Sequence, residues 1–117
     1  MRCGYSSTKT YPGGQTGKVM PVVIGLDVGT QGARAIACDQ SGRVLAQSSC
    51  PFDPRHQITH LPPGWFEQDA HVWWDAASTS LRAVAASLVR GGTDVGCVAA
   101  VAVDSTSGTI LPVDESG

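Results

Sequence analysis

Gly25-Leu-Asp-Val-Gly-Thr-Gln-Gly-Ala-Arg34 places Asp27, and then Gly29 and Gly32, at the end of an apolar run. It follows the apolar run Val22-Val23-Ile24 and precedes Ala35-Ile36-Ala37-Cys38, which predicts two buried strands joined by a tight hairpin turn at 29–32. Glycine allows positive φ and leaves backbone N–H groups open, and such amides can cradle phosphate oxygens. Asp27 can hold Mg²⁺ directly or through water. An ordinary glycine hairpin with a surface aspartate gives the same short pattern, and both interpretations stay open at this point.

Working outward from the hairpin, the pattern predicts strands over 22–27, 33–39 and 44–49, with a Gln40-Ser41-Gly42 turn between the last two. These three strands form an antiparallel meander. The segment 51–64 holds four prolines and is expected to be a long connecting loop.

A single amphipathic helix of about 20 residues follows the loop. Asp69 is a good N-cap, and Gly91-Gly92 ends the helix. The apolar residues at helical spacing are Trp73, Ala77, Leu81, Val84, Ala85 and Leu88.

After the helix, the apolar run over 98–103 predicts a buried strand that ends at Asp104, and 109–113 predicts a short fifth strand. A crossover helix makes the fourth strand parallel to the first, so the whole is the opening half of a mixed α/β sheet. Asp27 and Asp104 then both lie at the carboxyl ends of neighbouring parallel strands, where open α/β sheets place ligands. Two carboxylates that meet a phosphate need a cation, so Mg²⁺ is the economical inference.

Composition narrows the class of protein. The 117 residues are 42% hydrophobic and can bury the core of one domain or part of one. The segment 1–21 carries three basic residues and no acid, and it is expected to be a disordered leader or a cloning-derived sequence. The segment 22–117 carries five arginines against ten acids, which argues against a nucleic-acid-binding domain.

Cysteine spacing and hydropathy indicate the compartment. The four cysteines are scattered, so a disulfide framework or a zinc site is not expected and a reducing cytoplasm fits best. The longest apolar run, 95–103, is about nine residues against the roughly 20 that span a bilayer. We therefore expect a soluble cytoplasmic protein without membrane contact.

Three separated segments resemble one family, the FGGY carbohydrate kinases, members of the actin, Hsp70 and hexokinase superfamily. Residues 25–34 resemble its first phosphate motif. Pro63-Gly-Trp-Phe-Glu-Gln-Asp69 is similar to the stretch that leads into the first long helix of xylulose and glycerol kinases, and 100–109 to the sugar-pocket segment of ribulokinase-like members. The resemblance implies that 22–117 is an incomplete N-terminal domain with the ribonuclease H-like fold of actin-like ATPases.

The resemblance implies ATP and Mg²⁺ as cofactors, with Asp27 in the metal environment. Glu67 would contact the sugar, although a glutamate just before a helix also favours the helix N-terminus electrostatically, and the two interpretations stay open. The other residues expected at the ATP phosphates are Gly29, Thr30, Gln31 and Arg34, and those expected at the sugar hydroxyls are Asp104, Ser105 and Thr106.

The chain departs from the family pattern in two places. Ala70 replaces the proline that usually follows Gln-Asp, and the Gln-Met-His of xylulose kinases is absent after the fourth strand. The second departure favours a ribulose-like ketopentose over xylulose.

In this family the general-base aspartate and the adenosine-binding domain lie in the second half of the chain, beyond residue 117. We therefore interpret the sequence as a fragment of a sugar kinase that is inactive alone and whose full-length form is compatible with a homodimer. The alternatives are an actin-like or Hsp70-like nucleotide-binding module without sugar kinase activity, and an inert truncated remnant.

Overall fold

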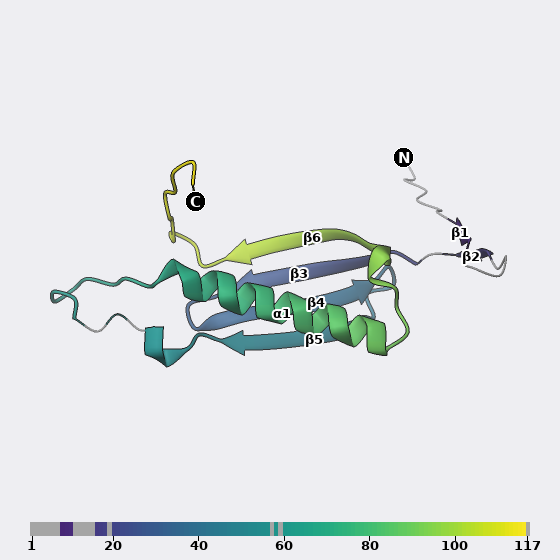
Figure 1. The fold of residues 1–117 in the computed structure, drawn as a ribbon, viewed down its shortest axis with the longest axis horizontal. Helices are drawn as coiled ribbons and strands as arrows, with labels where there is room; N and C mark the ends of the chain where they lie inside the picture. The colour runs from purple at the N-terminus through teal and green to yellow at the C-terminus, as the bar shows by residue number, and fades with distance from the viewer. Residues whose placement is uncertain (1–7, 11–15, 19, 57, 59, 117) are drawn as a thin grey trace.

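The computed structural model describes residues 8–10, 16–18, 20–56, 58 and 60–116. Its main body is a four-stranded mixed sheet with one long helix across one face (Figure 1). The sheet order is β5-β4-β3-β6, with β4 antiparallel to both neighbours and β6 parallel to β3. The elements are β3 (Val22–Val28), β4 (Gly32–Asp39), β5 (Val44–Pro51), α1 (Ala70–Arg90) and β6 (Val98–Ser105). The predicted meander, crossover helix and parallel fourth strand are confirmed. The prediction that the fourth strand is buried is wrong, because β6 lies at the edge of the sheet and is exposed from Ala99 onward.

Four shorter elements complete the described chain. Two are single turns of 3₁₀ helix, η1 (Pro54–His56) in the long loop and η2 (Val95–Cys97) before β6. The others, β1 (Thr8–Thr10) and β2 (Thr16–Lys18), pair with each other as a separate antiparallel sheet. The sequence analysis predicted no strand within residues 1–21, because three residues are too few to show a period, although threonine favours extended backbone. Most of the segment expected to be a disordered leader or a cloning-derived sequence, namely 1–7, 11–15 and 19, lies outside the described residues.

The turn between β4 and β5 is organised around one buried carboxylate. Asp39 Oδ1 accepts hydrogen bonds from the Ser41 hydroxyl at 2.6 Å, the Ser41 amide at 2.9 Å and the Arg43 amide at 3.1 Å. Gly42 supplies the left-handed residue of the turn, with φ +83°. The Ser41 hydroxyl, the two backbone amides and the Arg43 guanidinium together lower the pKa of Asp39 to about 2 against the opposing effect of burial.

Helix α1 begins and ends where its capping residues predict. The Asp69 side chain accepts from the His71 amide, and the amide of Gly91 donates to the Ser87 carbonyl. Among the described residues, no helix combines the length and apolarity that a membrane crossing requires.

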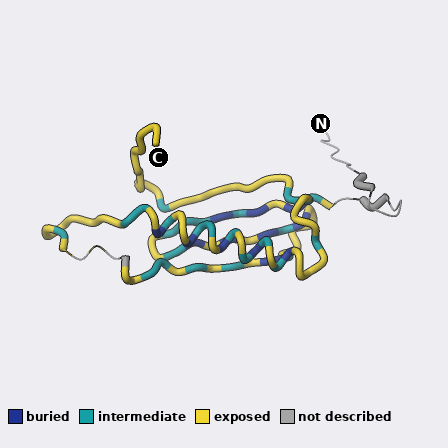
Figure 2. Tube along the Cα trace, in the orientation of Figure 1, coloured by how far each residue is buried: buried dark blue, intermediate teal, exposed yellow. Residues whose placement is uncertain are grey.

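The core lies between α1 and the strand faces beneath it (Figure 2). The sheet contributes small residues, among them Ala33, Ala35, Ala37 and Ala46. Trp73, Ala77 and Leu81, which the sequence predicted on the buried face of α1, are only half-buried. The buried residue in each case is the one immediately before it in the chain. The alanine surface admits short side chains, and Ser80 Oγ donates to the Ala33 carbonyl at 3.2 Å. The buried helix positions are Val72, Ala76, Ser80, Val84 and Leu88.

The predicted fifth strand over 109–113 is not present. After β6 the chain turns at Gly108, φ +79°, and the following residues adopt no regular structure. A strand needs a neighbour to pair with, and Ile110 and Val113 are 86% and 64% exposed. The apolar residues of 109–113 therefore have no strand to pair with among the described residues.

Candidate functional site

The strand register brings three charged side chains to one end of the sheet. Asp27 of β3 is the direct partner of Asp104 in β6 and of Arg34 in β4. In-register residues on neighbouring strands project from the same face, and the strands lie about 4.8 Å apart. Arg34 Nη1 is 3.5 Å from Asp27 Oδ2, with both side chains at least half exposed. The prediction that the two aspartates meet at adjacent strand ends is confirmed.

The hairpin turn 29–31 lies directly beyond Asp27. Gly29 donates its amide to the Gly32 carbonyl at 2.9 Å, which closes the turn, and Phe52 donates to the Gln31 carbonyl at 2.9 Å. Within the described chain, the amides of Thr30 and Gln31 make no backbone hydrogen bond, and both residues are exposed. The turn therefore presents two N–H groups and the Thr30 hydroxyl to an incoming ligand.

The reason for glycine at the two ends of this turn differs from the prediction. Neither Gly29 nor Gly32 has a positive φ. At Gly32 a Cβ atom would lie 2.5 Å from the Cys50 carbonyl oxygen and 2.8 Å from Pro51 Cα, so glycine is required by the close approach of β5. At Gly29 the nearest atom would be 3.6 Å away, an ordinary contact. Local packing explains the glycine at 32 and does not explain the glycine at 29.

The end of β6 lies beside the turn between β3 and β4. The amide of Thr106 donates to the Val28 carbonyl at 3.3 Å, which extends the parallel pairing beyond the strand ends. Ser105 follows Asp104, whose carboxylate accepts from the Ser105 amide at 2.8 Å. Asp104, Ser105 and Thr106, predicted to face a sugar, therefore lie beside the turn that is predicted to face a phosphate.

Two hollows adjoin these groups. The larger, about 800 Å³, lies over the sheet on the side away from the helix, with Asp27, Arg34 and Asp104 at one end and residues such as Gly25 and Ala102 along it. The smaller, about 110 Å³, lies at the strand tips, and its lining residues include Gly29, Thr30, Gln68, Trp73, Ser105 and Thr106.

Gln68 is a residue of this site that the sequence analysis did not assign. Its side-chain amide donates to the Thr30 carbonyl at 2.9 Å, and its carbonyl oxygen accepts from Trp73 Nε1 at 3.0 Å. The only sequence signal was its place between Glu67 and the helix cap Asp69, where it looked like part of the entry to the helix.

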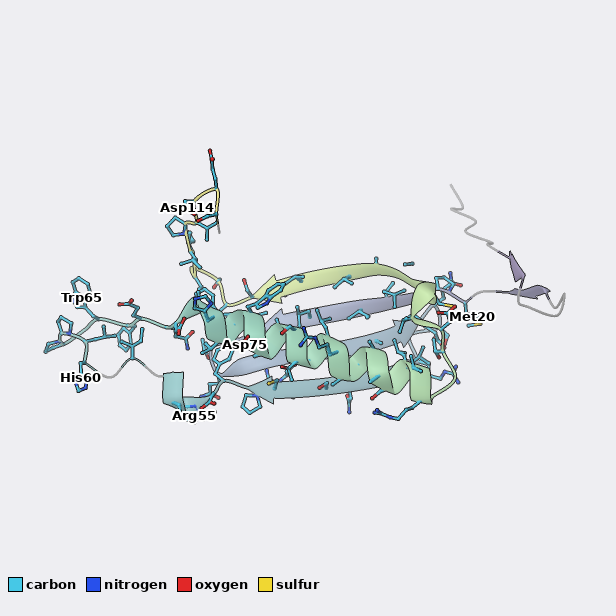
Figure 3. The ribbon with its side chains drawn as sticks, viewed as in Figure 1. Met20, Arg55, His60, Trp65, Asp75 and Asp114 are labelled. Carbon is cyan, nitrogen blue, oxygen red and sulfur yellow. The ribbon has the colours of Figure 1, made fainter. Side chains whose placement is uncertain are left out.

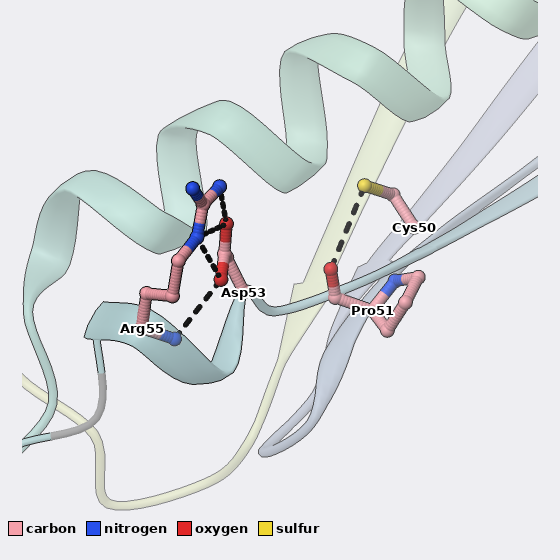
Figure 4. A network of polar contacts seen from close by, with 4 residues as sticks. All are labelled: Cys50, Pro51, Asp53 and Arg55. Atoms are coloured by element: carbon pink, nitrogen blue, oxygen red, sulfur yellow. Dashed lines mark hydrogen bonds and ion pairs between the residues drawn. The ribbon is translucent and has the colours of Figure 1, made fainter.

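Glu67 itself is exposed and lines neither hollow. The preceding loop extends beyond the end of the sheet, with Trp65 and His60 toward its tip (Figure 3). At the base of this loop the Arg55 guanidinium binds the Asp53 carboxylate, Nε lying 3.0 and 2.9 Å from its two oxygens (Figure 4). The structure thus does not bring Glu67 together with the other predicted sugar contacts.

Asp27 and Asp104 are the carboxylates of this site that could hold Mg²⁺. Over the described residues, no three His, Cys, Asp or Glu side chains converge as a metal cage. Magnesium is usually held by one or two carboxylates together with substrate phosphates and water, and Asp27 with Asp104 provides that minimal set. The site fits a cation that arrives with a phosphate and does not fit a resident structural metal.

Comparison with curated proteins finds several kinases that are similar to this chain. The chain is 33% identical over 103 residues to a ribulokinase of Geobacillus thermodenitrificans. This match covers 81% of this chain and 18% of that protein. The chain is 40% identical over 70 residues to an apulose kinase of Pectobacterium atrosepticum, covering 60% of this chain and 13% of that one. The chain therefore spans less than a fifth of the length of these relatives.

Solved structures agree on the fold. A xylulose kinase from Rhodospirillum rubrum superposes with a TM-score of 0.65 at 26% identity, over 82% of this chain and 18% of that one. The four-stranded mixed sheet with its crossover helix is thus the opening part of the ribonuclease H-like, actin-like ATPase fold. Residues 22–117 match the N-terminal domain of the FGGY family of carbohydrate kinases, and the chain belongs to that family.

Proposed function

We propose that this chain is the N-terminal segment of an ATP- and Mg²⁺-dependent carbohydrate kinase that transfers the γ-phosphate of ATP to a sugar hydroxyl. The observation that carries the proposal is the register that pairs Asp27 with Asp104 beside the open turn 29–31. One strand end offers groups that suit a phosphate, and its neighbour offers groups that suit hydroxyls.

Each group has a defined task in this scheme. The Thr30 and Gln31 amides and the Thr30 hydroxyl donate hydrogen bonds to phosphate oxygens, and Arg34 offsets their negative charge. The Asp27 carboxylate holds the cation directly or through water, and a bound Mg²⁺ would neutralise charge that develops on the phosphate during transfer. On the neighbouring strand end, the groups that face the sugar hydroxyls are Asp104, Ser105 and Thr106.

The proposed acceptor is a ketopentose of the ribulose type. Relatives named ribulokinase, xylulose kinase and apulose kinase support a pentose-sized substrate, and the absence of Gln-Met-His after β6 favours ribulose over xylulose. Glu67 remains a proposed sugar contact, which requires the loop before α1 to move toward the strand tips.

The isolated chain is proposed to lack turnover, because phosphoryl transfer depends on positioning between closed lobes. The test is therefore a hybrid enzyme in which residues 22–117 replace the matching segment of the Geobacillus thermodenitrificans ribulokinase. We expect ATP-dependent phosphorylation of ribulose in excess of xylulose and glycerol. Asp27→Asn in the hybrid should lower kcat/KM by at least about 10²-fold, whereas Asp75→Asn, on the exposed side of α1, should not.

Two outcomes would contradict the proposal. One is a hybrid that folds, as judged by circular dichroism, yet phosphorylates none of the three acceptors. The other is full turnover by the Asp27→Asn variant. Hydrolysis of ATP that is indifferent to the acceptor would favour the nucleotide-binding module without sugar kinase activity.

A further inference from the structure

The side chain of Gln68 bridges the turn 29–31 and the first turn of α1. Its Nε2 lies 2.9 Å from the Thr30 carbonyl oxygen, and its Oε1 lies 3.0 Å from Trp73 Nε1. An indole N–H can only donate and a backbone carbonyl can only accept, so these two partners fix which way the amide faces. A side chain at this position must donate at one end and accept at the other, which glutamine does and glutamate or methionine does not.

The bond to Thr30 has a consequence on the other side of the same peptide unit. The Thr30 carbonyl and the Gln31 N–H belong to one planar group, and in a trans peptide they point in opposite directions. No cis peptide occurs among the described residues. Gln68 holds the carbonyl toward the helix, and this directs the Gln31 N–H away from it, as a donor without a backbone partner.

Trp73, the partner of Gln68 on α1, is held in place by the packing of the helix. It lies in the first turn of α1 between the buried residues Val72 and Ala76 and is half-buried. Gln68 itself is exposed, so its two hydrogen bonds contribute to the direction of the turn rather than to the packing of the core.

We propose that Gln68 is a positioning residue, which ties the Thr30 carbonyl to the Trp73 indole and thereby aims the Gln31 N–H at the phosphate. The role in phosphate binding rests on the proposed function, whereas the role in orienting the peptide does not.

The orientation is tested by ¹H–¹⁵N NMR of the 117-residue chain, with Gln68→Met and Gln68→Glu. In Gln68→Met we expect the Gln31 amide and the Trp73 indole signals to shift, with the indole signals of Trp65 and Trp74 unchanged. The Gly29 amide, which closes the turn, should exchange with solvent roughly fivefold faster. Gln40→Met, in the exposed turn after β4, is the matched control and should change none of these signals.

Gln68→Glu adds a readout that a merely structural role would not give. Ionised at pH 7, glutamate can accept from Trp73 but cannot donate to Thr30, so only the Gln31 amide signal should be displaced. Below its ordinary pKa of about 4.3 the carboxyl gains a proton to donate, and the Gln31 signal should return toward its wild-type position. Signals of Gln68→Met that superimpose on wild type, or a Gln31 signal in Gln68→Glu that ignores this pH change, would overturn the proposal.

Calorimetry with Mg·ATP separates this inference from the proposed function. We expect the Kd of Gln68→Met to be roughly tenfold higher than that of wild type, the effect of one misdirected hydrogen bond to a charged group. Equal Kd values in the two proteins would overturn the positioning role and leave phosphate binding intact. If wild type itself fails to bind Mg·ATP, phosphate binding by the isolated chain is refuted, and the NMR signals alone decide whether Gln68 orients the turn.

Discussion

Gly29 and Gly32, the two glycines of the turn between β3 and β4, should respond in opposite ways to the same substitution. In Gly32→Ala the new Cβ would lie 2.5 Å from the Cys50 carbonyl oxygen and 2.8 Å from Pro51 Cα. Both obstacles are backbone atoms of β5, so relief requires the β4–β5 pairing to open at Gly32 and Pro51. Overpacking of this kind costs about 1–3 kcal/mol.

Gly29→Ala is the matched change three residues away. Its Cβ would lie 3.6 Å from the Gly32 carbonyl oxygen, and its φ is not in the left-handed region. Alanine there restricts the unfolded chain without strain in the folded one, which stabilises by about 0.4–1 kcal/mol. The two variants are thus expected to differ by about 1.5–4 kcal/mol, or by many degrees in Tm for a domain of this size.

Urea denaturation followed by tryptophan fluorescence measures both free energies of unfolding. The reasoning is refuted if Gly32→Ala is as stable as wild type, or if Gly29→Ala loses more stability than Gly32→Ala.

Three further changes test the core, the acid response and the metal requirement. Leu88→Ala should lower the free energy of unfolding in urea by about 2–5 kcal/mol, because Leu88 is 1% exposed. Trp74→Ala, at a position that is 75% exposed, should stay within about 0.5 kcal/mol of wild type in the same measurement. The pKa of Asp39 is lowered from 3.8 to about 2, so the contribution of this carboxylate to stability is complete above about pH 4 and is lost as the pH falls toward 2. Melting curves of Asp39→Asn should lack this part of the pH dependence. The same dependence of Tm on pH in the variant and in wild type would contradict the hydrogen-bonded turn. Mg²⁺ without nucleotide should bind weakly to the chain because Asp27 and Asp104 supply only two carboxylates, and calorimetry showing tight binding of the bare ion would contradict that account of the site.

Local signals in the sequence were sufficient for most of the sheet and for the helix. The meander follows from apolar runs separated by glycine turns, and α1 runs from the cap at Asp69 to Gly91 as those residues predict. The meeting of Asp27 and Asp104 followed from topology alone, because a crossover helix makes β6 parallel to β3.

Features that depend on tertiary packing escaped prediction. Ser80 is polar and so was not counted in the apolar stripe, yet the alanine face of the sheet lets it approach and bond to Ala33. Gly32 was attributed to backbone conformation, when the reason is the approach of β5, which no local pattern reveals. The missing strand over 109–113 shows the same limit, since a short apolar segment cannot say whether a partner strand exists.

The sequence predicted that the candidate residues of β3 and β6 lie at adjacent strand tips, and it missed the contact of Gln68 that supports the turn. The charged and hydroxyl residues at the two strand tips stand out by type and position. Gln68 reaches Thr30 across 38 positions of sequence, and a neutral amide in a loop gives no sign of such a contact before the chain is folded.

The central claim is that the turn after β3 and the tip of β6 form one site for a metal-bound phosphate. Its most direct test is paramagnetic broadening of backbone amide signals by Mn·ATP, since Mn²⁺ accepts the same oxygen ligands as Mg²⁺. The account predicts that the signals of Asp27, Thr30, Asp104 and Ser105 broaden first and that those of the β4–β5 turn around Gly42 stay sharp. Broadening centred elsewhere on the chain, or sharp signals at both tips with Mn·ATP bound, would contradict it.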